Sequence, residues 1–193
     1  MLKQYISADQ LLRDSCELGL RIAQSGFRPT LIVGVWRGGT PVAIAVQEVL
    51  DFLGISCDHI AIRTSSYSGL EQGAHVAVHG LDYLYNKLTA DDRLLIVDDV
   101  HDTGLSMEQV LKELRAHFGA EAPVTKLAMP YFKPSHNQTA REPDFYLHTT
   151  SAWLVFPHEL QGLSDTEIMG KHGLQDLTPR LLRLRDQLAK SLS

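Results

Sequence analysis

Residues 94–97 constrain the fold more than any other part of the chain. Their sequence, Leu-Leu-Ile-Val, predicts a fully buried strand, and two carboxylates, Asp98 and Asp99, follow it directly. After a short turn, apolar residues recur at helical spacing at Met107, Val110 and Leu114. The order strand, tight loop, helix is typical of an α/β protein whose loops carry the chemistry.

The turn at residues 102–106 suits a phosphate group. Backbone N–H groups and the positive end of a helix dipole converge there, and Thr103 and Ser106 add hydroxyl donors. Asp98 and Asp99 would repel phosphate, but they can accept hydrogen bonds from vicinal hydroxyls or hold Mg²⁺. Phosphate beside paired hydroxyls suggests ribose 5-phosphate. The alternative is that the acids only cap the helix of an ordinary α/β turn.

A second turn repeats the same plan. Residues 31–36 predict a buried strand, Arg37-Gly38-Gly39 a turn, and residues 42–53 a helix. Two glycines let backbone amides approach an anion, and Arg37 can bind phosphate oxygens with two N–H groups, so pyrophosphate is the expected guest. Taken alone, the motif also fits a plain tight turn. Two such turns at the carboxyl ends of neighbouring strands would form a ligand crevice.

Composition narrows the class of protein. With 193 residues and 44% hydrophobic content, the chain can bury a substantial core. A net charge of −5 argues against nucleic acid as a partner. The two cysteines, Cys16 and Cys57, favour free thiols in a reducing compartment, and no apolar stretch reaches membrane-spanning length. We therefore expect a cytoplasmic protein that binds small molecules and neither nucleic acid nor membrane.

The regular alternation of strands and helices predicts an α/β fold with a parallel, doubly wound sheet. We expect a core domain at residues 1–130, a small hood of short strands at 131–175 that includes strands at 145–148 and 153–157, and a C-terminal helix at 176–193. The polar, glycine-containing segment 64–73 is either an inert mobile hairpin or a functional loop.

Residues 97–106, Val-Asp-Asp-Val-His-Asp-Thr-Gly-Leu-Ser, resemble the diphosphoribose-binding signature of the type I phosphoribosyltransferases. These enzymes exchange the pyrophosphate of 5-phosphoribosyl 1-diphosphate (PRPP) for a nitrogenous base. An acid at Asp102 is similar to the 6-oxopurine branch, which handles hypoxanthine, guanine and xanthine. The resemblance implies Mg²⁺ as cofactor, PRPP and a purine base as substrates, and a homodimer or homotetramer. It also implies a cis peptide at Trp36–Arg37.

The resemblance assigns roles to individual residues. Asp102 is the expected general base for the purine nitrogen. Ser66 and Tyr67 look like the Ser-Tyr pair of a flexible lid, and Asp98, Asp99 and Glu159 are expected metal ligands. The residues expected to bind PRPP are Arg37, Gly38, Gly39, Asp98, Asp99, Asp102, Thr103, Gly104, Leu105 and Ser106.

Three residues are expected to recognise the purine. In the resembled enzymes an aromatic ring stacks on the base, an adjacent backbone segment bonds its edge, and a lysine donates to the 6-oxygen. Trp153, Leu154 and Lys133 fit these roles, since an ammonium attracts a carbonyl oxygen and repels the amino group of adenine. Taken singly, Trp153 also fits the hydrophobic core and Lys133 a solvated surface charge.

Two further functions remain open at this stage. One is a PRPP-sensing regulator that keeps the binding loops without the chemistry, although the acidic balance disfavours a nucleic-acid surface. The other is a phosphoribosyltransferase for another base. His101 and Leu105 depart from the usual signature, and the sequence offers no reason for either.

Overall fold

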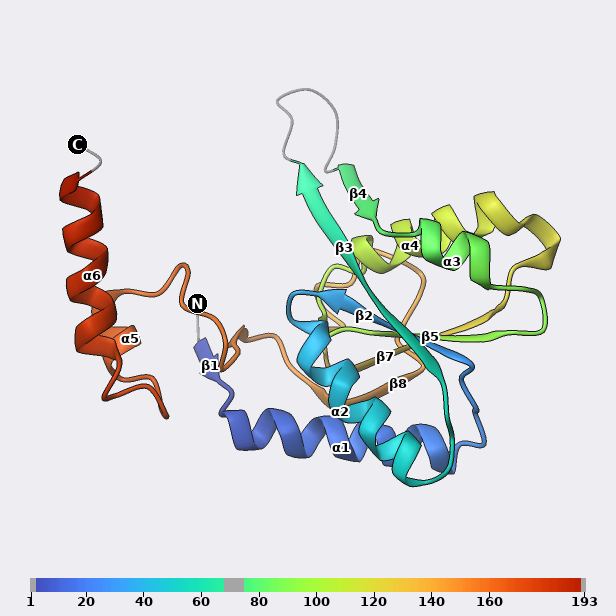
Figure 1. The fold of residues 1–193 in the computed structure, drawn as a ribbon, viewed down its shortest axis with the longest axis horizontal. Coiled ribbons are helices and arrows are strands. Elements are labelled where there is room, and N and C mark those ends of the chain that lie inside the picture. The colour runs from blue at the N-terminus through green and yellow to red at the C-terminus, as the bar shows by residue number, and fades with distance from the viewer. Residues whose placement is uncertain (1–2, 68–74, 192–193) are drawn as a thin grey trace. The chain divides into compact units, whose positions relative to one another are not determined.

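The computed structural model describes residues 3–67 and 75–191 (Figure 1). Within these residues a seven-stranded sheet has the order β4-β3-β2-β5-β7-β6, and β8 also pairs with β7. All its pairings are parallel except that of β3 with β4. The strands are β2 (Leu31–Trp36), β3 (Asp58–Tyr67), β4 (His75–His79), β5 (Arg93–Val97), β6 (Val100–His101), β7 (Val124–Phe132) and β8 (Phe145–Thr149).

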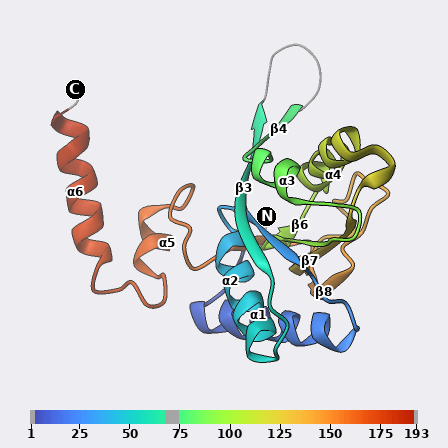
Figure 2. The same cartoon turned by 45° about the vertical axis from the view of Figure 1, so that its right-hand side comes forward.

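Helices cover both faces of this sheet, as Figures 1 and 2 show from two directions. On one face lie α2 (Gly39–Phe52) and most of α1 (Ala8–Gln24), and on the other α3 (Asp82–Lys87) and α4 (Leu105–Phe118). A short 3₁₀ helix, Gly119–Glu121, follows α4. The central strands are apolar on both faces because each face is covered by helices. The predicted parallel, doubly wound α/β fold is confirmed.

The hydrophobic core under α3 and α4 follows the two periodicities of the chain. Side chains alternate along β2, so Leu31, Val33 and Val35 face these helices. From α4 the buried residues recur every three or four positions. They are Met107, Val110, Leu111 and Leu114. This packing fixes the carboxyl end of β5 against the start of α4.

The chain divides into two compact units. One contains Leu12–Ser151, and the other contains Met1–Leu11 together with Ala152–Ser193. In the second unit, β1 (Lys3–Tyr5) pairs in parallel with β9 (Trp153–Val155). Two helices complete it, α5 (Asp165–Met169) and α6 (Thr178–Ser191). Ser164 and Glu167 form a capping box at the start of α5, and Lys3 binds Glu167 at 2.5 Å.

The structure differs from the sequence-based expectations at three places. Residues 145–148 were expected in the hood, but they form β8 in the central sheet, and residues 131–132 belong to β7. A long loop, not a helix, joins β7 to β8, so the usual pattern of a parallel crossover is absent from the sequence. Helix α3 was not among the expected elements. Residues 64–67 extend β3, and the rest of the predicted lid, 68–73, lies outside the described residues.

Candidate functional site

The two predicted anion-binding turns lie side by side. Strands β2 and β5 are parallel neighbours, with Gly34 opposite Val97, so the turns that follow them leave the same edge of the sheet. A methyl group on Gly39 would lie 2.5 Å from the Val97 carbonyl oxygen and 2.9 Å from Oδ1 of Asp98. One on Gly38 would overlap the Asp99 carboxylate. Only glycine therefore lets the two turns approach this closely.

The Asp98–Asp99 pair holds negative charge in a confined place. Burial, and after it the neighbouring Asp99 carboxylate, raise the pKa of Asp98 well above its usual value. The backbone N–H of Asp99 donates to Oδ1 of Asp98 at 3.0 Å, which partly offsets this effect. Carboxylates in such surroundings favour a ligand that brings hydroxyl donors or a cation.

The sheet continues beyond these acids. Val97 lies opposite Ala128 and Val100 lies opposite Tyr131, so β5 and β6 share one register with β7 on either side of Asp98 and Asp99. One of the two residues of β7 between these pairings, Pro130, has no N–H to donate to a ladder. The pairing with β7 is therefore interrupted at Asp98 and Asp99. It resumes at β6, which fixes the position of Asp102.

The predicted phosphate turn forms the N-terminus of α4. Gly104 is the N-cap residue and has a left-handed conformation, with φ of 79°. A methyl group there would lie 2.7 Å from Oδ1 of Asn137 and from Oγ1 of Thr139. The Gln138 N–H donates to the Thr103 carbonyl at 2.9 Å. The loop after β7 therefore packs against this turn and fixes its shape.

Asp102 is bound by two donors from that loop. The Lys133 ammonium donates to Oδ2 at 2.8 Å, and Nδ1 of His136 lies 2.8 Å from Oδ1. Burial opposes ionisation of Asp102, but the hydrogen bonds from Lys133 and His136 outweigh it and lower its pKa. Lys133 is 4% exposed, so it is not the solvated surface charge that a lone lysine suggests.

The structure accounts for the unusual His101 of the signature. Its side chain is buried, and its ring packs edge to face on Phe132 with the ring centroids 5.5 Å apart. Burial lowers the pKa of His101, so the imidazole is neutral at physiological pH. A methyl group on Gly104 would lie 2.8 Å from its Nε2. His101 is therefore a packed aromatic ring that lies between Phe132 and Gly104 of the phosphate turn.

Other predicted positions are placed less completely. The Trp36–Arg37 peptide is cis, as the resemblance implies, and Arg37 itself is exposed. Leu105 and Ser106 form the first turn of α4 and are partly buried. Ser66 and Tyr67 end β3, opposite Val76 and His75. The role of this Ser-Tyr pair in a lid stays a prediction.

Three predicted residues belong to the second unit. Trp153 is 53% exposed, so it is not a core residue, and the adjacent Leu154 is buried. Oε2 of Glu159 accepts a hydrogen bond from the Phe156 N–H at 3.0 Å, so part of this carboxylate already serves the local turn. Lys171 also donates to the Phe156 and Glu159 carbonyls of that turn.

Sequence reasoning missed the residues between Lys133 and Arg141. His136, Asn137 and Thr139 were part of an unassigned polar loop, yet they contact Asp102 or the phosphate turn. These contacts follow from a strand pairing that the sequence does not mark. Because β6 pairs with the end of β7, residues that follow His101 and residues that follow Phe132 leave the sheet together.

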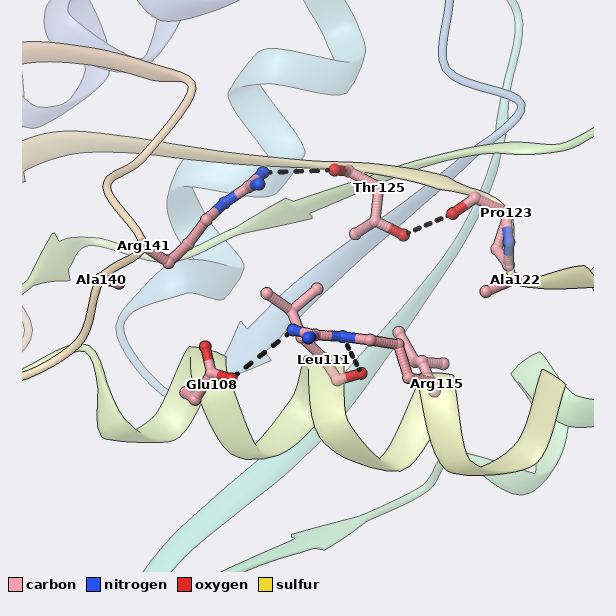
Figure 3. A pocket seen from close by; sticks show the side chains of 9 residues that line it. Glu108, Leu111, Arg115, Ala122, Pro123, Thr125, Ala140 and Arg141 are labelled. Atoms are coloured by element: carbon pink, nitrogen blue, oxygen red, sulfur yellow. Dashed lines mark hydrogen bonds and ion pairs between the residues drawn. The ribbon is translucent and has the colours of Figure 1, made fainter. Parts of the chain in front are cut away.

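A separate cavity of about 510 Å³ lies between α4 and the start of β7 (Figure 3). Two arginines line it, but Arg115 already binds Glu108 at 3.5 Å and Arg141 binds Asp144 at 2.6 Å. None of the predicted PRPP-binding residues lines this cavity. We therefore place the candidate site at the two turns and not here.

Two features are absent from the part of the chain that the structure describes. Over residues 3–67 and 75–191 no three or more His, Cys, Asp or Glu side chains are grouped so that they could hold a metal ion. Mg²⁺ does not require such a group, because it commonly uses one or two carboxylates and takes further oxygens from substrate phosphates. Across the same residues, every helix is too short or too polar to cross a membrane.

Comparisons with known proteins agree with this geometry. Purine phosphoribosyltransferase from Pyrococcus horikoshii is 30% identical, with a TM-score of 0.64 over 85% of this chain and 99% of that one. Xanthine-guanine-hypoxanthine phosphoribosyltransferase from Helicobacter pylori shares the fold at 22% identity, with a TM-score of 0.67 over 92% of this chain and 99% of that one. The family model described as the phosphoribosyl transferase domain matches residues 3–161. The resemblance read from residues 97–106 is thus confirmed, and the chain belongs to the phosphoribosyl transferase family.

Proposed function

We propose that the protein is a purine phosphoribosyltransferase that joins a 6-oxopurine to PRPP and releases a nucleoside 5′-monophosphate and pyrophosphate. The observation that carries this proposal is the buried Lys133 bound to Asp102 beside the phosphate turn. It provides an ammonium and a carboxylate together at the point where the base would meet the sugar. The purine activity of the Pyrococcus relative supports the same class of substrate.

The base would be recognised by complementary donors and acceptors. An ammonium carries three hydrogens, and Lys133 uses one of them on Asp102. Another can reach a 6-oxygen, whereas the 6-amino group of adenine would present a donor to a donor. A site built to bond an acceptor rejects an analogue without one strongly, because a buried charge is left unpaired. We propose that Trp153 stacks on the purine and that the Leu154 backbone bonds its edge.

Residues of the two turns would assist the transfer of the phosphoribosyl group to the purine. As a purine nitrogen forms its bond to the sugar carbon C1, the bond from C1 to the pyrophosphate oxygen breaks and its electron pair leaves with pyrophosphate. Arg37 and the Gly38 and Gly39 amides would stabilise the departing charge. The proton on the purine nitrogen would pass to Asp102, which is kept ionised at neutral pH by its lowered pKa.

Asp98 and Asp99 would hold the ribose hydroxyls, and the turn at residues 102–106 would hold the 5-phosphate. The Asp98–Asp99 donor set also fits Mg²⁺, because confined, like-charged carboxylate oxygens favour a hard cation. Bound Mg²⁺ would supply positive charge to the pyrophosphate leaving group. Glu159 is a further proposed ligand. A cytoplasmic location and a homodimer or homotetramer remain predictions from the sequence.

A substrate panel tests the proposal. The purified protein is mixed with PRPP and Mg²⁺ and, separately, with hypoxanthine, guanine, xanthine, adenine and uracil, and monophosphate and pyrophosphate are measured. We expect product with at least one oxopurine and none with adenine or uracil. Product with adenine or uracil alone would overturn the assignment of the base. Binding of PRPP without turnover of any base would instead favour a PRPP-sensing regulator.

A further inference from the structure

His136 contacts Asp102, and the resemblance to the phosphoribosyltransferases gives this histidine no role. The carboxylate of Asp102 uses one oxygen on Lys133 and the other on His136, each at 2.8 Å. A carboxylate with a donor on only one oxygen can rotate about its bond to Cβ. With a donor on both oxygens, its plane is fixed.

The charge state of Asp102 determines how the imidazole must be protonated. An ionised carboxylate only accepts hydrogen bonds, and the lowered pKa of Asp102 keeps it ionised at neutral pH. Nδ1 of His136 must therefore carry the hydrogen in this contact. The His136 side chain is 37% exposed, so its ring has both a fixed end at Asp102 and an open end.

The backbone holds His136 in this position. Lys133 is anchored to β6 by its N–H, which donates to the His101 carbonyl at 2.9 Å. The chain then turns back on itself, and the His136 and Asn137 N–H groups both donate to the Lys133 carbonyl, at 3.0 and 3.2 Å. Beyond this turn, Gln138 is bound to Thr103. The contact between His136 and Asp102 thus belongs to a hydrogen-bonded loop with anchors at both ends.

We propose that His136 is a positioning residue for the transfer step, which fixes the Asp102 carboxylate so that its remaining lone pairs face the purine nitrogen. This inference rests on the proposed function. Lys133 cannot do this alone, because it donates to only one of the two oxygens of Asp102 and would leave the carboxylate free to rotate. His136 therefore holds Asp102 in place while Lys133 is shared with the substrate. When a catalytic general base is misoriented by about 1 Å, turnover typically slows about 100-fold.

A pair of isosteric variants tests the role. His136→Asn keeps an N–H donor at about the position of Nδ1, whereas His136→Leu has nearly the same shape and no donor. His59→Ala serves as a control, because His59 is an exposed histidine at the opposite, amino-terminal end of the central strands. Thermal unfolding of each variant checks that the fold is kept, and kcat is measured together with KM for PRPP and for the preferred base.

We expect His136→Leu to lower kcat about 10- to 100-fold with KM for PRPP within about twofold of wild type. His136→Asn should recover most of kcat, and His59→Ala should match wild type. Equal kcat values for wild type and His136→Leu, or equal losses in His136→Leu and His136→Asn, would overturn the inference while leaving the proposed function intact. A wild-type protein that converts no base at all would overturn the proposed function and this role with it.

Discussion

Asp98 and Asp102 lie four residues apart, Asp98 directly after β5 and Asp102 directly after β6, yet their surroundings are opposite. Asp98 sits against Asp99 and the glycine turn, and its pKa is raised. Asp102 lies between Lys133 and His136, and its pKa is lowered. The first region gathers carboxylates, whose charge a ligand with hydroxyl donors or a cation can offset. The second is compensated before any ligand arrives, as preorganised catalytic groups are.

The largest effect is expected from Asp102→Asn. This change keeps the shape of the side chain and removes the proton acceptor, so kcat should fall about 10²- to 10⁴-fold. KM for PRPP should stay within about threefold, because Asp98 and Asp99 would hold the ribose hydroxyls and the substitution keeps the backbone N–H groups of the phosphate turn. Steady-state kinetics with PRPP and the preferred base measure both. Equal losses in kcat and PRPP affinity would refute the role of Asp102 as base.

The next effect concerns the contact between the two turns. A methyl group at Gly39 would overlap the Val97 carbonyl and the Asp98 carboxylate, so Gly39→Ala must push the turns apart. We expect the free energy of unfolding to fall by about 1–3 kcal/mol and PRPP binding to be lost. Gly170→Ala is the control, since its added methyl would meet ordinary contacts of 3.6 Å or more. A stable Gly39→Ala variant with normal PRPP binding would contradict the geometry.

A smaller effect should separate base recognition from sugar recognition. Lys133→Met removes the ammonium and keeps the apolar stem. A hydrogen bond to a charged group is worth about 1.5–3 kcal/mol, so KM for the oxopurine should rise about 10- to 100-fold. KM for PRPP should change little. Lys126→Met, near the start of the strand that Lys133 follows, is the control. A rise in KM for PRPP alone would show that Lys133 serves PRPP and not the purine.

The smallest effect is on stability, and it has opposite signs in the two regions. The raised pKa of Asp98 means that the folded state is penalised at pH values above it, so stability rises as pH falls from that pKa toward the ordinary carboxyl range near 4. The contribution of Asp102 is full above that range and is lost as pH falls through its lowered pKa.

Urea unfolding between pH 4 and pH 8 therefore separates the two acids in the ligand-free protein. Asp98→Asn should be more stable than wild type at pH 8, with an advantage that shrinks toward pH 4. Asp102→Asn should be less stable than wild type at pH 8. Two variants that shift stability in the same direction would show that the regions do not differ as described.

The sequence predicted the parts of the site that lie close together along the chain. The strand, acids and turn at residues 94–106 form one local pattern, and both glycine turns are marked by their own residues. The regular alternation of predicted strands and helices also predicted the parallel sheet. These features depend on short-range periodicity and turn chemistry, which a single sequence records well.

The missed features depend on pairing between distant segments. Nothing near His136 marks it as a partner of Asp102, because that contact arises only once β6 pairs with the end of β7. Strand β8 was misplaced for a similar reason, since a loop and not a helix leads to it. His101 looked polar in the sequence but packs as an aromatic ring on Phe132.

Calorimetric titration of PRPP in the presence of Mg²⁺ tests most directly whether Asp98 and Asp99 bind PRPP while Asp102 serves the transfer step. Wild type, the Asp98→Asn/Asp99→Asn double variant and Asp102→Asn are compared under the same conditions. The difference between the two regions predicts that Asp102→Asn binds PRPP within about threefold of wild type, while the double variant binds it at least about 100-fold more weakly, as expected for two lost charged hydrogen bonds. Wild-type affinity in the double variant, or an equal loss in Asp102→Asn, would contradict it.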